Sequence, residues 1–115
     1  MSTRSQSAQR SGFSQEEAAR CLETLGHATR LEIFRLLVRA GHPGLPVGQI
    51  QEHLGIPAST LSHHVAQLVQ TGLVVQEREG RSLICKPDFE QMDRVIAYLT
   101  DECCVLAEAP SGTSA

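Results

Sequence analysis

Residues 47–74 read VGQIQEHLGIPASTLSHHVAQLVQTGLV, and this stretch decides the fold. Apolar residues recur in it every three or four positions, at Val47, Ile50 and Leu54 and then at Leu61, Val65, Leu68 and Val69. This spacing is typical of two amphipathic helices. The tight connection Gly55-Ile56-Pro57 separates the two segments. The pattern predicts a helix over 47–54 and a second helix over 58–71, joined as a helix-turn-helix.

The periodicity changes directly after this unit. Residues 73–78 (LVVQER) and 81–86 (RSLICK) are rich in strand-forming residues, and Glu79-Gly80 between them is a two-residue hairpin signal. A β-hairpin that follows a helix-turn-helix predicts the winged variant of that fold.

Further helices are predicted on both sides of this unit. Ser14 and Glu17 have the spacing of a capping box, and the helix that they begin ends at Gly26. A second helix covers 29–40, and a last helix runs from 88 to about 104. The last helix carries an apolar stripe formed by Phe89, Met92, Val95, Ile96, Leu99 and Cys103. The predicted fold is mainly α (α+β), a winged helix-turn-helix in the order α-α-α-α-β-β-α over residues 14–107, with flexible tails at 1–13 and 108–115.

Length and composition bound the class of protein. The chain has 115 residues, which is enough for one small domain, and its formal net charge is -3. That charge argues against a general polyanion binder but allows a local basic surface. No apolar run is long enough to cross a bilayer, and the polar N-terminus is no secretory signal, so we expect a cytoplasmic protein with no membrane partner. We find no phosphate loop and no nucleophile–base pair, so we expect no enzyme.

The second helix of a helix-turn-helix enters the major groove of DNA. Hydroxyl, imidazole and amide groups on its exposed face can bond phosphates and base edges. The residues expected to do this are Ser59, Thr60, Ser62, His63 and Gln67, with Arg78 and Arg81 of the hairpin on the DNA backbone or minor groove. The alternative is a solvated helix face whose serines only cap the helix, with His64 as a satisfied core histidine.

Three segments together carry a family resemblance: LGHATRLEIFRLL (25–37), the stretch 47–74, and EREGRSLIC (77–85). They resemble the ArsR/SmtB family of metal-sensing winged-helix repressors. The resemblance implies a homodimer through the first and last helices, a palindromic operator in double-stranded DNA, and an inducer ion that releases the DNA.

The family places its ion ligands at different positions, and two of these sites are absent from this sequence. The family's Cys-Val-Cys arsenic segment corresponds here to Val47-Gly48-Gln49, and the last helix has no histidine for a zinc site. The segment Thr100-Asp101-Glu102-Cys103-Cys104 instead resembles a branch with a C-terminal cysteine pair. That likeness implies a response to trivalent arsenic.

Thiolates suit such an ion, because soft ligands select soft acceptors. Trivalent arsenic and antimony prefer three thiolates, and the candidates are Cys85, Cys103 and Cys104. A straight last helix would separate Cys85 from Cys103 within one chain by roughly 22 Å. We therefore expect two equivalent sites that span the dimer interface. Cys21 is expected to be a small core residue.

Two other functions remain open. A thiol redox sensor of the same fold would form a disulfide between Cys85 and Cys103 or Cys104. A small metal-buffering protein would not bind DNA. The polar residues on the second helix of the helix-turn-helix, over 58–71, argue against this function. The choice between arsenite, antimonite and methylated trivalent arsenic depends on the number of thiolates, because a methylated arsenic has only two positions left for sulfur.

Overall fold

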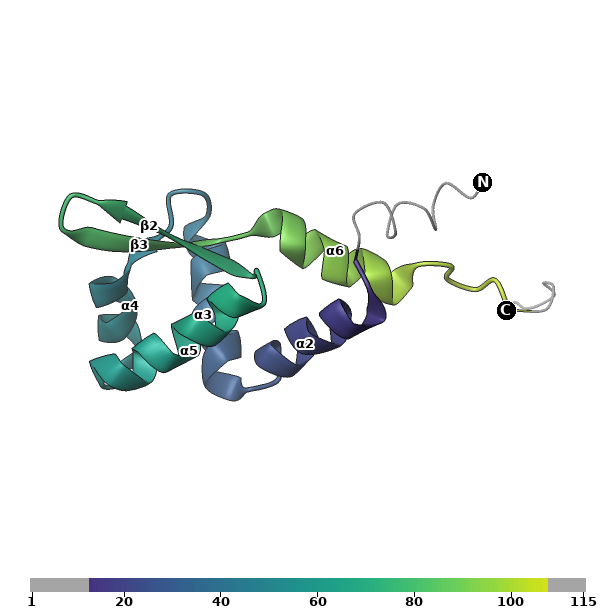
Figure 1. Ribbon diagram of the computed structural model, residues 1–115, viewed down its shortest axis with the longest axis horizontal. Coiled ribbons are helices and arrows are strands. Elements are labelled where there is room, and N and C mark those ends of the chain that lie inside the picture. The colour runs from purple at the N-terminus through teal and green to yellow at the C-terminus, as the bar shows by residue number, and fades with distance from the viewer. Residues whose placement is uncertain (1–12, 108–115) are drawn as a thin grey trace.

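The computed structural model describes residues 13–107, and the two predicted tails lie almost entirely outside this range (Figure 1). Within it the elements follow in the order α2 (Gln15–Leu25), α3 (Ala28–Ala40), β1 (Leu45–Pro46), α4 (Val47–Leu54), α5 (Ala58–Gln70), β2 (Val74–Glu79), β3 (Ser82–Pro87) and α6 (Phe89–Thr100). The predicted winged helix-turn-helix and its order of helices and wing strands are confirmed. The short strand β1 was not predicted.

Helix α2 begins as its sequence predicts. The Ser14 hydroxyl accepts a hydrogen bond from the Glu17 amide at 3.1 Å, and the Glu17 carboxylate accepts one from the Ser14 amide at 3.3 Å. Phe13, which the prediction assigned to the tail, is 5% exposed and packs edge-on against Tyr98 of α6 with ring centroids 6.1 Å apart. The folded part therefore begins at least one residue before the predicted boundary.

The core lies where α3, α4, α5 and the base of the wing meet. Its fully buried side chains come from each of these elements and from α2: Ile33, Leu37, Ile50, Leu61, Leu68, Leu73, Val74, Cys21 and Cys85. Burying one large aliphatic side chain stabilises a fold by about 1.5–3 kcal/mol. The helix-turn-helix is thus held by its apolar stripes, which leaves its polar face free.

The sheet is antiparallel, and β3 lies between β1 and β2. Cys85 of β3 is opposite Leu45 of β1 and Gln76 of β2. Strand β1 has two residues, one of them Pro46, so it carries too little pattern to be recognised in the sequence. Gly44 allows its approach, because its φ is +71° and a side chain there would collide with the Cys85 carbonyl group.

Helix α6 is shorter than predicted. It ends at Thr100, and the residues up to Leu106 form turns, so Cys103 and Cys104 lie outside the helix. The prediction relied on the apolar stripe, but Ile96 and Leu99 on that stripe are 52% and 60% exposed among the described residues, so the apolar spacing near the end of the helix does not correspond to burial there. The Thr100 hydroxyl also bonds back to the Ile96 carbonyl at 3.1 Å, a contact that competes with helix propagation.

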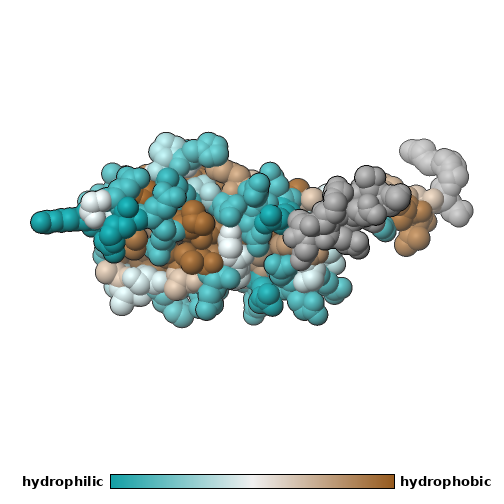
Figure 2. Space-filling model, turned by 45° about the horizontal axis from the view of Figure 1, so that its top comes forward, coloured by the Kyte–Doolittle hydropathy of each residue, from teal (hydrophilic) through white to brown (hydrophobic). Residues whose placement is uncertain are grey.

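The two ends of the molecule are formed by different elements, and exposed apolar residues gather at one of them. The wing, α4 and α5 form one end, while α2 and α6 run side by side toward the other (Figure 1). Figure 2 shows hydrophobic side chains at the C-terminal end, next to the grey atoms. Large apolar residues are exposed on α2, on α6 and in the turns after it: Leu22, Ile96, Leu99, Val105 and Leu106.

In the part of the chain that the structure describes, no helix has the length and hydrophobicity to span a membrane.

Candidate DNA interface and thiol site

The first turn of α5 presents free hydrogen-bonding groups. Its N-cap is Pro57, and no side chain caps it. Ser59, Thr60 and Ser62 are exposed, and their hydroxyls bond no residue in the described range 13–107. The capping alternative is therefore excluded for these serines. Uncapped amide groups at a helix start, with hydroxyls beside them, suit a phosphate.

The two adjacent histidines of α5 have different environments. His63 is exposed, whereas His64 is 8% exposed. The Arg30 Nε group donates to His64 Nδ1 at 3.2 Å, and the His27 ring lies 4.7 Å from the His64 ring. Burial lowers the pKa of His64, and the charges of His27, Arg30 and His63 lower it further. His64 is thus a satisfied core histidine, and His63 is the one that can reach DNA.

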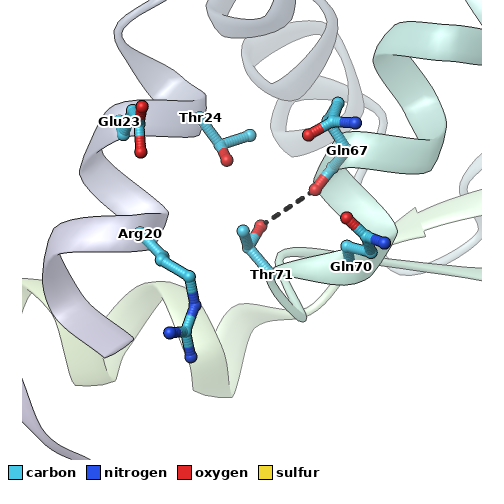
Figure 3. A pocket seen from close by; sticks show the side chains of 6 residues that line it. All are labelled: Arg20, Glu23, Thr24, Gln67, Gln70 and Thr71. Carbon is cyan, nitrogen blue, oxygen red and sulfur yellow. Dashed lines mark hydrogen bonds between the residues drawn. The ribbon is translucent and has the colours of Figure 1, made fainter. Parts of the chain in front are cut away.

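Gln67 does not lie with the other predicted DNA contacts. It is half-buried and turns toward α2, where it lines a cavity with residues of that helix (Figure 3). Gln67 was predicted on the open face because it lies one turn beyond His63. The packing of α2 along this side of α5 depends on the tertiary fold and has no signal in the local sequence.

The wing carries two unpaired arginines. Glu79 and Ser82 are opposite each other at its tip, and Gly80 takes the φ of +62° that the turn requires. Arg78 and Arg81 are exposed, and neither forms an ion pair with any residue of the range 13–107. The third basic residue, Lys86, is bound to Glu77 at 2.8 Å. The wing arginines therefore remain available to phosphates.

Cys85 lies at the centre of the sheet. Its side chain is fully buried and receives a weak hydrogen bond from the Gln76 amide, with nitrogen and sulfur 3.6 Å apart. Burial raises the pKa of the Cys85 thiol. In this protomer the sulfur is a protonated core group.

Cys103 and Cys104 form an exposed pair beyond the end of α6. Their sulfur atoms are in contact with each other. Adjacent residues on a regular helix point about 100° apart, but Cys104 has a φ of +68° within a turn. The hydrogen bond with Cys104 and the charge that Cys104 takes on when ionised raise the pKa of Cys103. A cation that binds both sulfurs would relieve this repulsion.

The three predicted thiol ligands do not meet within one protomer. The 12 residues of α6 separate Cys85 from the pair by a rise of roughly 18 Å. Among residues 13–107 there is no cluster of three or more His, Cys, Asp or Glu side chains placed to hold a metal ion. The structure brings Cys103 and Cys104 together and leaves Cys85 apart.

Gln91 is a buried polar residue that was not predicted, and it connects α6 to α2 and to the end of α5. Gln91 of α6 is 8% exposed, and its Nε2 group lies 3.6 Å from the sulfur of Cys21, which is buried as predicted. The Gln91 side chain also contacts Thr71 and Arg94. The only signal in the sequence was a glutamine beside the apolar stripe of the last helix.

Comparison with known proteins agrees with this fold. Residues 25–77 match a family described as a helix-turn-helix domain. The chain is 31% identical over 91 residues to the HTH-type transcriptional regulator YgaV of Escherichia coli, covering 79% of this chain and 90% of that protein. The absence of enzymatic activity that we expected agrees with that description.

Solved structures indicate which family of helix-turn-helix regulators the chain resembles. The homodimeric winged helix-turn-helix DNA-binding domain of Mb0332 from Mycobacterium bovis, described as a possible ArsR-family regulator, is 27% identical with a TM-score of 0.61, over 74% of this chain and 76% of that one. A possible transcriptional regulator for arsenical resistance is 26% identical with a TM-score of 0.60, over 68% of this chain and 78% of that one. With its helix-turn-helix, its wing and these relatives, the chain belongs to the ArsR/SmtB family of winged-helix, DNA-binding transcriptional regulators.

Proposed function

We propose that this protein is a cytoplasmic repressor that leaves its operator when trivalent arsenic binds the thiolates of Cys103 and Cys104. The observation that carries the proposal is the exposed pair of adjacent thiols in contact with each other beyond the end of α6. One similar structure is described as a possible regulator for arsenical resistance, which supports the same ion.

The chemistry of the pair favours a soft, thiophilic ion. Among residues 13–107 no histidine or carboxylate completes a group of three ligands with these sulfurs, as a zinc site would require. Each bond between trivalent arsenic or antimony and a thiolate sulfur replaces one bond to hydroxide, and the thiol proton leaves with that hydroxide as water. Two thiolates suffice for a methylated trivalent arsenic, whereas arsenite and antimonite take a third sulfur.

Cys85 remains our predicted third ligand. Two conditions must be met for it to bind the ion. Its thiol is fully buried in the protomer, so the strand must open or shift before an ion reaches it. The partner's cysteine pair would have to approach that strand in the dimer. The two-thiolate site makes no such demand.

We infer that the chain acts as a homodimer on a palindromic operator. The apolar residues exposed on α2 and α6, such as Leu22, Ile96 and Leu99, offer a surface that a second copy would cover. The related Mb0332 domain is homodimeric. Because the cysteine pair follows α6 directly, an ion bound there would change the dimer contacts and with them the spacing of the two α5 helices.

Each half of the operator would be read by α5 and its wing. We propose that His63 and Ser62 contact base edges, that Ser59 and Thr60 contact phosphates with the free amides of the first turn, and that Arg78 and Arg81 contact phosphates. Gln67 is a weaker candidate, since it turns toward α2.

Arsenic bound per protomer tests the ligand set. Reduced protein is incubated with arsenite or with methylated trivalent arsenic, desalted and analysed by native mass spectrometry. We expect Cys103→Ser and Cys104→Ser each to abolish retention of both forms, and Cys21→Ala to retain them as the matched control. If Cys85→Ser loses only arsenite, Cys85 is the third ligand. Full retention by the Cys103→Ser/Cys104→Ser protein would refute the site.

The same contact between sulfurs favours one second candidate, a redox-sensing repressor. The disulfide predicted between Cys85 and one of these cysteines cannot form within one protomer, but the two adjacent thiols can be oxidised to a disulfide by peroxide and reduced by dithiothreitol. A redox sensor would release DNA with peroxide and rebind it with dithiothreitol while ignoring arsenite. An arsenic sensor responds to arsenite under fully reducing conditions.

A further inference from the structure

A cavity of about 400 Å³ lies between α2 and the last turns of α5 (Figure 3). It is lined by six residues that all have polar side chains: Arg20, Glu23, Thr24, Gln67, Gln70 and Thr71. It is separate from the cysteine pair, and it lies on the side of α2 that bears Arg20 and Thr24 rather than Leu22. Apart from Gln67, which is a weaker candidate for DNA contact, none of these groups belongs to the proposed DNA contacts.

Thr24 presents to the cavity a hydroxyl group that no described residue bonds. The residue is 6% exposed, and its hydroxyl points into the cavity (Figure 3). No residue in the range 13–107 bonds this hydroxyl, whereas the Thr71 hydroxyl across the cavity bonds the Gln67 carbonyl at 3.3 Å. A buried hydroxyl without a partner destabilises a fold, so proteins keep few of them. A bound molecule would satisfy it.

The charges of the cavity define the class of that molecule. Arg20 and Glu23 both belong to the α2 wall; in Figure 3 Glu23 lies beside Thr24 and Arg20 lies below them. Within the described residues neither forms an ion pair with the other or with a third group. A simple anion would be repelled by Glu23 and a simple cation by Arg20. A molecule with both charges matches the two together.

We propose that this cavity binds a small zwitterion of the α-amino acid class. Its carboxylate would pair with Arg20 and accept a hydrogen bond from the Thr24 hydroxyl, and its ammonium group would pair with Glu23. The side-chain amides of Gln67 and Gln70 face it from α5 and would contact a polar side chain. The volume of the cavity exceeds that of one such molecule, which leaves room for water.

Isothermal titration calorimetry with the common L-α-amino acids tests the proposal on the full-length reduced protein without DNA. We expect at least one of them to bind at millimolar concentration or below. Arg20→Gln and Thr24→Val should each weaken that binding roughly tenfold or more, the loss expected when a charged or buried hydrogen-bonding partner is removed. Arg39→Gln, on the exposed face of α3, is the matched control and should bind as the parent does.

Thr24→Val separates a binding role from a structural one. Valine has nearly the shape of threonine and removes the unpartnered hydroxyl, so its Tm should equal or exceed that of the parent while its amino-acid binding is lost. Two analogues of the amino acid that binds are also measured: one lacks the ammonium group and the other lacks the carboxylate. Each should bind at least tenfold more weakly than the amino acid itself. The proposal is overturned if no amino acid binds, if the carboxylate alone binds equally well, or if Thr24→Val binds like the parent.

Discussion

The side-chain amide of Gln91 donates a hydrogen bond to the backbone carbonyl of Thr71 at 2.9 Å, and so joins α6 to the C-terminal end of α5. The Gln91 carbonyl in turn accepts from Arg94 at 2.9 Å. Gly72 makes room for this contact, because a side chain there would come within 3.1 Å of the Gln91 amide. The helix that leads to the cysteine pair is thus bonded to the helix that we expect to read DNA.

Removing this bond should destabilise the domain. Gln91→Leu keeps the size of the side chain but leaves the Thr71 carbonyl without its Gln91 partner, which costs about 1–3 kcal/mol in the free energy of unfolding. Urea denaturation followed by circular dichroism measures it. Gln49→Leu, at an exposed position of α4, is the control and should change stability by less than about 0.5 kcal/mol. Equal stability of the two variants would show that the bond has no energetic role.

The bond between Arg30 and His64 predicts a pH dependence of stability. His64 accepts through a neutral ring nitrogen, and its pKa in the folded protein is lowered from 6.5. The unfolded chain therefore binds a proton at a higher pH than the folded chain does. The stabilisation is complete above the unfolded pKa and is lost as the pH falls through the folded pKa. His64→Gln, which does not titrate, should flatten this part of the profile.

Urea denaturation at a series of pH values between about 7.5 and about 5 measures this effect. His53→Gln, an exposed histidine of α4, is the matched control and should keep the slope of the parent. A slope unchanged in His64→Gln would mean that other groups cause the pH dependence.

Arg78 and Arg81 should contribute to DNA affinity without sequence preference. Replacing either with alanine should weaken binding to specific and unrelated DNA alike, and should reduce the slope of log K against log salt by about 1 for each phosphate that the variant no longer binds. Fluorescence anisotropy at several salt concentrations measures both quantities. Arg39→Ala on α3 serves as the control. A weakening confined to the specific site would instead assign the arginine to base recognition.

His63 should contribute to specificity. His63→Ala removes a side chain that we place at a base edge, so binding to the operator should weaken by about 1–3 kcal/mol while binding to unrelated DNA stays close to that of the parent. Both DNAs are measured at one salt concentration. The exposed His53→Ala should leave both affinities unchanged. A parallel weakening on both DNAs would move His63 to a phosphate contact.

The sequence predicted most of the fold, because the deciding elements bury regular apolar stripes. The capping box at Ser14 and the helix over 47–54 formed where the local pattern indicated. The hairpin also formed, but its turn is Gly80-Arg81 rather than Glu79-Gly80, because Glu79 pairs with Ser82 and Gly80 supplies the positive φ. Strand β1 has no such pattern. The end of α6 was misjudged because apolar spacing alone does not reveal whether a partner surface exists within the chain.

The candidate site was predictable in part. The exposure of Ser59, Ser62 and His63 followed from their positions opposite the core stripe, and these three are exposed as expected. The orientation of Gln67 and the burial of Cys85 depend on how α2 and β1 pack, which is tertiary information. Likewise, the contact between Cys103 and Cys104 arises from a turn with a positive φ that no local pattern announces.

The most direct test of the account is the release of promoter DNA by trivalent arsenic under reducing conditions, followed by anisotropy of a fluorescent fragment. We predict that arsenite or its methylated form weakens DNA binding of the parent protein by about 5–150-fold, the usual range of allosteric coupling. The Cys103→Ser/Cys104→Ser protein should bind DNA normally and ignore the ion, while Cys21→Ala should respond. Release of DNA from the double variant, or an intact complex of the parent at saturating arsenic, would contradict the account.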